Sequence, residues 1–453
     1  MTSLGPAPAL PDAPPRWVGP RGRQILHTGA WSMVAKAAIA ANLFLTVPFV
    51  LHALGPAQFG AWATLVSLVM FAGFLDFGIG NGSMNLLAAA HGRGASVEVA
   101  VILREGRRTL LQVALWLAGA VLVALPLVPW YRLLGMPQTM AGPSRGAAAT
   151  VLFTIVLSVP LNLANRAQLG LGRGDRAFRW QAVGQLLTLG VVVGLARVHA
   201  SLMVMTAAAV ATPLLSSIAN TTLLWRDPAM ATSVLVTRDP KIAAHIRREG
   251  MQFFVLQLAA AVAFSADLPL ISALRGSTDA GTYAIVQRLF SLVPMGLSLI
   301  WAPLWPIYRN ALAAGDHDWV VRTLRRSLLF AVLSACAAAL VLALGFDRIV
   351  GLWVHQPLEV GSMLLAGFVV WSTLDAAGGA LGTFLNAASI MRYQITLAII
   401  FGTSCIVAKI FILQHFALDA LPWTNAAVYA VTILFPLSLL FPRILRIILI
   451  KKF

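Results

Sequence analysis

The sequence has few charged residues and almost no cysteine. Only 11 % of its 453 residues are charged, and Asp and Glu together number 16 against 33 Lys and Arg. The two cysteines, Cys336 and Cys405, both lie in apolar stretches, which excludes a disulfide framework and the paired spacing of a zinc site. A soluble protein of this length needs more polar surface than these residues supply.

The sequence is rich in long apolar runs, and 59 % of its residues are hydrophobic. We predict an all-α polytopic membrane protein with about twelve transmembrane helices. The predicted segments lie near residues 25–51, 60–81, 109–130, 147–171, 180–196, 203–225, 251–274, 283–308, 327–346, 361–386, 394–414 and 425–442.

The net charge of +17 is distributed according to topology. If the N-terminus is cytoplasmic, 24 of the 33 Lys and Arg residues lie in the termini and the even-numbered loops. Five lie in the opposite loops, namely Arg132, Arg145, Arg197, Arg275 and Arg348. This bias predicts that both termini are cytoplasmic, and it explains the charge without a nucleic-acid partner.

An internal repeat divides the chain. A shift of 221 positions aligns Gly29 with Gly250, Pro48 with Pro269, Gly55 with Gly276, Gly60 with Gly281 and Ala63 with Ala284. Repeats of this kind are typical of transporters built from two related bundles. We predict a disordered cytoplasmic tail at 1–24, a six-helix bundle at 25–225, a cytoplasmic connection at 226–250, a second six-helix bundle at 251–442 around a shared central cavity, and a basic cytoplasmic tail at 443–453.

Four cations lie inside predicted spans: Lys36, Arg166, Arg288 and Lys409. Each costs about 2.5 to 3.5 kcal/mol at the centre of a membrane helix, so such residues normally face protein or water. We expect them to bind an anionic substrate. Two alternatives stay open: Lys36 reaches the cytoplasmic interface, and the polar stripe around Arg166 serves only to hydrogen-bond neighbouring helices.

Three carboxylates, Asp76, Asp267 and Asp375, are candidate counter-charges or sites for a coupling proton or sodium ion. The alternatives are an Asp76 pair with a cytoplasmic arginine, and structural pairs of Asp267 with Arg288 or of Asp375 with Lys409. The glycines after Asp76 do not form a phosphate-binding loop, because no Lys-Ser or Lys-Thr follows them. We expect no cofactor.

Three stretches carry a resemblance to a known family: ALGPAQFGAWATL (Ala53 to Leu65), LDFGIGNG (Leu75 to Gly82) and GTYAIVQRL (Gly281 to Leu289). They resemble the Wzx-type polysaccharide-unit flippases of the multidrug/oligosaccharidyl-lipid/polysaccharide exporter superfamily. The resemblance implies alternating access in a bacterial inner membrane and an undecaprenyl-pyrophosphate-linked oligosaccharide as substrate. It also implies a place in O-antigen, lipopolysaccharide, capsule or exopolysaccharide biosynthesis, beside a polysaccharide polymerase and chain-length proteins.

Two other functions compete with this interpretation. A multidrug efflux antiporter of the same superfamily usually carries cations, which an excess of basic residues does not favour. A membrane polymerase or ligase of lipid-linked glycans needs a large outer loop with catalytic residues. The longest predicted outer loops, near 131–146 and 347–360, are short, and no HExxH motif or paired carboxylate motif is present, so we do not expect an enzyme.

Overall fold

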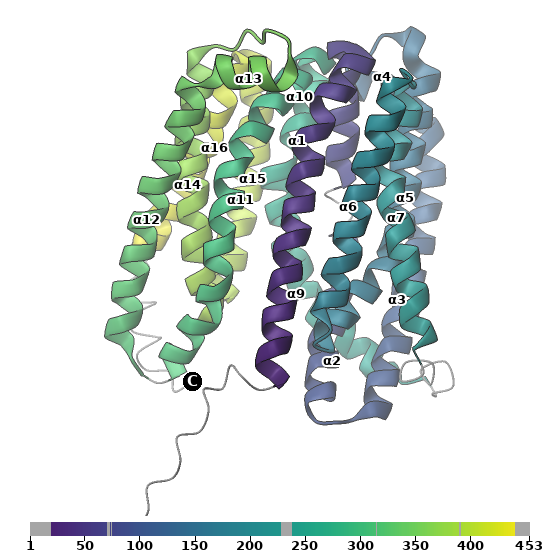
Figure 1. Cartoon of the computed structure of the whole chain (residues 1–453), viewed down its shortest axis with the longest axis vertical. Helices are drawn as coiled ribbons and strands as arrows, with labels where there is room; N and C mark the ends of the chain where they lie inside the picture. The colour runs from purple at the N-terminus through teal and green to yellow at the C-terminus, as the bar shows by residue number, and fades with distance from the viewer. Residues whose placement is uncertain are drawn as a thin grey trace, which may run out of the picture.

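The computed structural model describes residues 20–69, 73, 75–227, 238–313, 315–388 and 391–439, which contain helices and no strand (Figure 1). The N-terminal half contains α1 (Pro20–Leu68), α2 (Ile79–Gly92), α3 (Ser96–Leu127), α4 (Trp130–Leu133), η2 (Gln138–Met140), α5 (Ala141–Gly170), α6 (Gly174–Arg197) and α7 (Leu202–Arg226). The C-terminal half contains α9 (Pro240–Ser265), α10 (Asp267–Arg275), α11 (Ser277–Ala313), α12 (His317–Leu344), α13 (Phe346–Val354), α14 (Ser362–Ala387), α15 (Met391–His415), η4 (Leu418–Ala420), α16 (Leu421–Tyr429) and η5 (Ala430–Leu434).

Ten helices within the described residues are long and apolar enough to cross a membrane. The first of them, His27–Leu68, covers two predicted segments because α1 turns back on itself at Gly55. The predicted segment near 251–274 corresponds to the consecutive helices α9 and α10. The predicted all-α membrane fold is therefore confirmed. The structure has ten candidate membrane-spanning helices within the described residues instead of the predicted twelve because of these two places.

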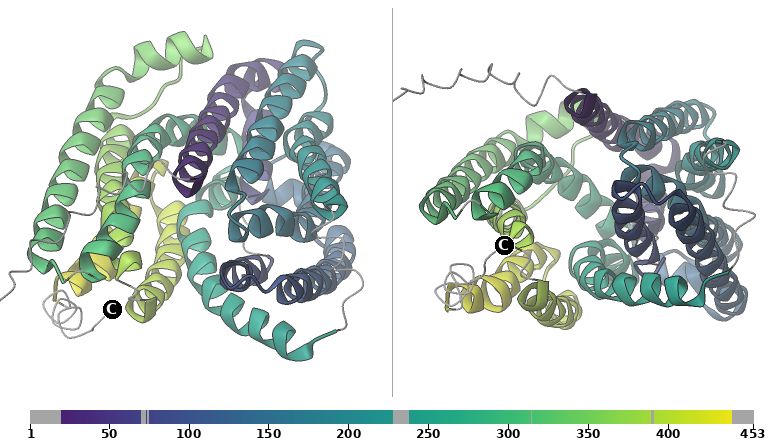
Figure 2. Two further views of the ribbon diagram at one scale, coloured as in Figure 1. Left: turned by 60° about the horizontal axis from the view of Figure 1, so that its bottom comes forward. Right: turned by 90° about the horizontal axis from the view of Figure 1, so that it is seen from below.

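The helices form two bundles that stand side by side (Figures 1 and 2). In the first bundle α1, α2, α3, α5, α6 and α7 pack against one another, and in the second α10, α11, α12, α14, α15 and α16 do so. The bundles meet where α1 contacts α11, and we call this contact the seam; in addition, α9 contacts α2 and α3 of the first bundle and α15 of the second. The largest apolar core spans the seam, since Phe59 and Trp62 of α1 belong to the same buried cluster as Tyr283 and Phe290 of α11.

The predicted repeat is visible at the turns of two helical hairpins. Gly55 has φ 73° and ψ 169°, and Gly276 has φ 101° and ψ 167°, so the two glycines adopt nearly the same left-handed backbone conformation. Residues with a Cβ rarely adopt it, which explains why the sequence has glycine at both positions. We call the end of the molecule with these turns the hairpin end, and the opposite end, where α2 joins α3 and α5 joins α6, the basic end.

A second pair of repeat-related glycines lets the bundles touch near the hairpin end. A Cβ on Gly60 would overlap the carbonyl oxygen of Ser277, and a Cβ on Gly281 would lie 3.1 Å from the carbonyl oxygen of Pro56. The backbone of each hairpin thus approaches the other directly. Larger side chains at these positions would force the hairpins apart.

The short helix α13 also joins the bundles at the hairpin end. The indole Nε1 of Trp353 donates a hydrogen bond of 2.8 Å to the carbonyl oxygen of Phe44 in α1. Pro48 lies four residues after Phe44 inside α1 and has no N–H, so this carbonyl lacks its usual donor within the helix. The proline therefore leaves an acceptor that a helix of the second bundle uses.

The predicted tails and connection differ from the helix boundaries. Residues 1–19 and 440–453 lie outside the described part of the chain, while α1 begins at Pro20, inside the tail predicted at 1–24. The helix α9 begins at Pro240, inside the predicted connection 226–250, because Asp239 accepts hydrogen bonds from the amides of Lys241 and Ile242. An aspartate followed by proline is a strong helix start.

Candidate functional site

Arg288 crosses the seam between the bundles. It lies on α11, and its Cζ is 5.2 Å from the ring centroid of Trp62 and 5.9 Å from that of Phe59, both on α1. Its Nη1 is buried and has no hydrogen-bond partner among the described residues. No carboxylate among the described residues forms an ion pair with Arg288. Stacking on aromatic rings offsets only part of the cost of a buried guanidinium, so positive charge remains at this point.

Lys36 lies on the same seam, nearer to the basic end. From α1 its Nζ donates a hydrogen bond of 3.3 Å to the hydroxyl of Ser298 on α11. The lysine is half-buried, and no described carboxylate forms an ion pair with it. Lys36 and Arg288 thus place two cations, each without a described counter-charge, on the surfaces along which the bundles meet.

Arg166 lies inside the first bundle, beside Asp76. The carboxylate of Asp76 accepts hydrogen bonds from the amides of Gly78 at 2.8 Å and Gly80 at 3.1 Å, and so caps α2. Arg166 interacts with it electrostatically, and a Cβ on Gly80 would lie 2.5 Å from Asp76 Oδ2 and 3.2 Å from Arg166 Cγ. The predicted alternative of a helix-end carboxylate near an arginine therefore fits Asp76, although that arginine lies on α5 and not in a loop.

Arg166 also faces a polar pocket of about 330 Å³ between α5, α6 and α7. Its polar lining residues are Asn162, Asn165, Arg166, Trp180, Gln181, Gln185, Ser216 and Ser217. The buried amide of Asn220 supports one wall, because it donates to Asn165 at 2.8 Å and accepts from Gln168 at 2.6 Å. Part of the polar stripe predicted around Arg166 thus lines a pocket, while Arg173, just beyond the end of α5, pairs with Asp227 at 2.6 Å.

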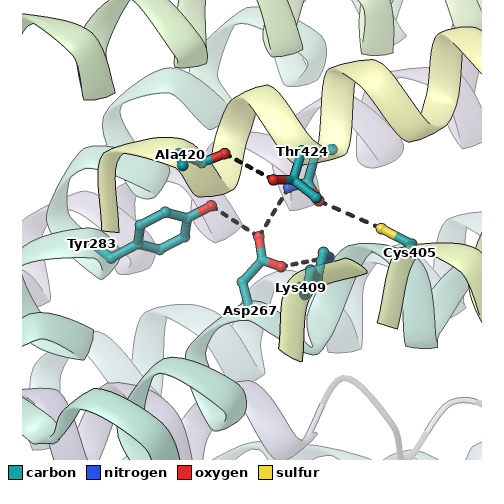
Figure 3. A network of polar contacts seen from close by, with 7 residues as sticks. Asp267, Tyr283, Cys405, Lys409, Ala420 and Thr424 are labelled. Atoms are coloured by element: carbon teal, nitrogen blue, oxygen red, sulfur yellow. Dashed lines mark hydrogen bonds and ion pairs between the residues drawn. The ribbon is translucent and has the colours of Figure 1, made fainter. Parts of the chain in front are cut away.

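Lys409 and Asp267 form a sealed ion pair in the second bundle (Figure 3). The Nζ of Lys409 lies 2.5 Å from Oδ1 of Asp267, and the lysine side chain is 0 % exposed. Oδ2 of Asp267 accepts a hydrogen bond of 3.0 Å from the hydroxyl of Tyr283 and one of 3.3 Å from the amide of Asn425. The pair connects α10, α11, α15 and α16, and it sits where the seventh predicted span breaks between α9 and α10.

This pair corrects the predicted arrangement of charges. The suggested pairs were Asp267 with Arg288 and Asp375 with Lys409, but Asp267 pairs with Lys409 because α10 packs directly against α15. Lys409 therefore adds no net charge to a substrate surface. Asp375 is half-buried on α14, and no cation among the described residues pairs with it.

The four predicted cations consequently do not form one cluster. Two lie on the seam, one faces the pocket of the first bundle, and one is neutralised. Sequence reasoning missed Tyr283, Asn220 and Asn425, which hold the buried polar groups in place. The two asparagines had a signal, since each is a polar residue inside an apolar span, whereas Tyr283 had none.

No protein-family model matches this sequence, and neither does any curated protein. Solved structures do match it. The inward-facing conformation of a multidrug resistance MATE family transporter of the MOP superfamily has a TM-score of 0.74 and 14 % identity, over 92 % of this chain and 99 % of that chain. The outward-facing conformation of a transporter with the same description has a TM-score of 0.65 and 14 % identity, over 96 % of this chain and 98 % of that chain.

A third match is a MOP superfamily transporter from Pyrococcus furiosus, whose binding pocket is described as having reverse polarity that suggests a different function. Its TM-score is 0.67 at 14 % identity, over 95 % of this chain and 98 % of that chain. The chain therefore has the two-bundle fold of MATE-type transporters of the MOP superfamily. This confirms the predicted two-bundle fold, whereas the superfamily and the flippase family within it stay predictions.

Proposed function

We propose that this protein is a transporter that moves undecaprenyl-pyrophosphate-linked oligosaccharides from the cytoplasmic to the periplasmic leaflet of a bacterial inner membrane. The observation that carries the proposal is Arg288, whose buried Nη1 has no hydrogen-bond partner in the described residues. A cation is rarely retained at such a place unless it binds something. Lys36 supplies a second cation on the same seam.

A pyrophosphate fits these two cations better than a cationic drug does. Guanidinium groups bind phosphate oxygens through two parallel hydrogen bonds, and the attraction is stronger in a site of low dielectric constant than in water. A lateral opening between the bundles at the seam would leave the polyprenyl chain in lipid. The pyrophosphate and the sugars would then pass between the bundles in a shared central cavity.

The motion would be a rocking of one bundle against the other, as in transporters with related halves. Opening the hairpin end requires separating Gly60 from Gly281 and Trp353 from Phe44. A proton or sodium gradient would supply the energy without an organic cofactor. Among the three predicted carboxylates, Asp375 is the best coupling site, because Asp76 caps α2 and Asp267 is paired with Lys409.

The test uses a bacterial strain that lacks its own polysaccharide flippase, with surface glycan and the lipid-linked intermediate measured together. The wild-type chain should restore surface glycan and clear the intermediate. Arg288→Gln should reduce export by about ten-fold or more, because the lost hydrogen bonds involve charged groups. Arg145→Gln is the matched control, since Arg145 is exposed near the hairpin end, and it should export normally.

Normal export by Arg288→Gln at normal membrane abundance would contradict the role of this arginine.

Absence of glycan in several hosts with different repeat units, despite good expression, would favour the second candidate, a multidrug efflux antiporter. The fold supports that candidate because two of the matched structures are multidrug resistance MATE transporters. Extrusion of cationic dyes that depends on Asp375 and not on Arg288 would then be expected. Co-purification from the same strain tests whether a polysaccharide polymerase and chain-length proteins bind this transporter.

A further inference from the structure

The helix α3 presents three arginines and two leucines on one face, outside the seam and the pocket. Arg107 and Arg108 lie three and four residues after Arg104, and Leu111 and Leu115 lie four and eight residues after Arg107, which places all five along one side of the helix. They line a groove of about 340 Å³ whose far wall is Trp225, in the last turn of α7. The Cζ of Arg107 lies 5.1 Å from the centroid of the Trp225 ring, which orients its guanidinium.

Two arginines of this groove keep their charge exposed. Arg107 and Arg108 are exposed and form no ion pair with any described residue. Glu105, on the same helix, is 2 % exposed and turns away, since its Oε1 accepts a hydrogen bond of 3.3 Å from the amide of Asp239. Other arginines at the basic end do have partners: Arg93 pairs with Glu98, Arg173 with Asp227 and Arg179 with Asp175.

The composition of α3 indicates that the groove lies at the depth of a membrane surface. The arginines occupy the part of α3 that follows its start at the basic end, and the long apolar part of the helix begins at Leu110. Leu111 is 42 % exposed and Leu115 is 73 % exposed, so apolar surface continues from the arginines toward the middle of the membrane. The tryptophan at the end of α7 lies at the same level, where tryptophans commonly meet the lipid headgroups.

The second bundle repeats the row of residues without its aromatic wall. On α12, Arg322, Arg325, Arg326, Leu329 and Leu333 have the same spacing as the five residues of α3. Leu329 and Leu333 are exposed as well. None of these three arginines stacks on the ring of a described aromatic residue. The chain therefore offers two rows of equal charge, of which the α3 row has a groove closed by a tryptophan.

We propose that the α3 groove binds the phosphate of an anionic glycerophospholipid, with the acyl chains lying along Leu111 and Leu115. The guanidinium groups and the apolar strip are adjacent in the same order as the headgroup and the chains of a membrane lipid. The site lies on the outer side of the first bundle, so it binds a bilayer lipid and not the transported substrate. The inference does not depend on the proposed function.

The experiment measures phosphatidylglycerol binding to the purified full-length chain in detergent by native mass spectrometry. Arg107→Gln/Arg108→Gln should weaken binding by about ten-fold or more, because each arginine near a membrane surface contributes to attraction of an anionic lipid. Arg325→Gln/Arg326→Gln removes the same charge from the matching row on α12 and should change binding by less than about two-fold, since that row lacks the wall.

Three results would overturn the proposal: equal weakening by both double variants, equal binding of phosphatidylcholine and phosphatidylglycerol, or full competition by inorganic phosphate. Equal weakening by both double variants would mean that overall positive charge, and not the groove, attracts the lipid. Full competition by inorganic phosphate would mean that the site holds free phosphate. If the double glutamine variant does not fold, Trp225→Leu replaces it. This variant keeps every charge, and unchanged binding by it would equally contradict a site built around the tryptophan.

Discussion

In the first bundle, Arg166 and Asp76 lie near each other without an ion pair, and the arginine faces a pocket of about 330 Å³. In the second bundle, Lys409 and Asp267 are in contact at 2.5 Å, and the lysine is fully buried. The two bundles share a helical repeat, yet one holds its cation beside a polar pocket and the other seals it. A cation within a membrane span is therefore a candidate ligand-binding residue only where its counter-charge leaves it available.

The largest effect is expected from breaking the sealed pair. Lys409→Met should destabilise the protein by about 3 to 5 kcal/mol, because it leaves the carboxylate of Asp267 buried without its counter-charge. The measurement is the thermal unfolding midpoint of the purified protein in detergent, together with its abundance in membranes. The double variant Asp267→Asn/Lys409→Met removes both charges and should recover most of the loss. Equal instability of the single and double variants would show that packing, and not charge, governs this site.

A smaller effect on stability and a larger one on transport are expected for Arg166. Its Nε has no hydrogen-bond partner among the described residues, so Arg166→Gln should cost less than about 1 kcal/mol of stability. We expect the glycan to reach Arg166 through the polar pocket, so export of the lipid-linked glycan should fall by about ten-fold when this charged hydrogen bond is lost. Arg145→Gln, on the same helix, is the control. A large stability loss with normal export would make Arg166 a structural partner of Asp76 and would erase the contrast between the bundles.

The smallest effect concerns the neutral network beside the pocket. Asn220→Ala removes the amide that joins Asn165 to Gln168, and it should destabilise the protein by about 1 to 2 kcal/mol. Chemical denaturation in detergent measures this loss, with Asn162→Ala as a control that lines the pocket without bonding to Asn220. A loss as large as that of Lys409→Met would mean that the polar interior of the first bundle is as tightly sealed as the second.

The sequence was sufficient to predict features that depend on backbone conformation and hydrophobicity. Long apolar runs specify helices in a membrane because each run must satisfy its own backbone hydrogen bonds. Gly55 and Gly276 were aligned by the repeat, and both adopt positive φ at equivalent turns. Glycine at such turns is difficult to replace, so the signal survives even where the surrounding residues differ.

Pairing between distant side chains was not predictable in the same way. Asp267 and Lys409 are both rare charges in apolar helices, but their contact depends on α10 packing against α15. Nothing in the spacing of residues along either helix fixes that choice of neighbour. The groove on α3 shows the same limit, because the arginine row is evident in the sequence whereas Trp225 joins it only through the fold.

The hydrogen bond from Trp353 to the carbonyl of Phe44 has a consequence for the resting population of the protein. It exists only while the hairpin end is closed, because its donor and its acceptor belong to different bundles. A bond of this kind contributes about 1 kcal/mol, which changes an equilibrium by roughly five-fold. A proline in one helix, by freeing one carbonyl, would thus shift the equilibrium by about five-fold toward molecules whose hairpin end is shut.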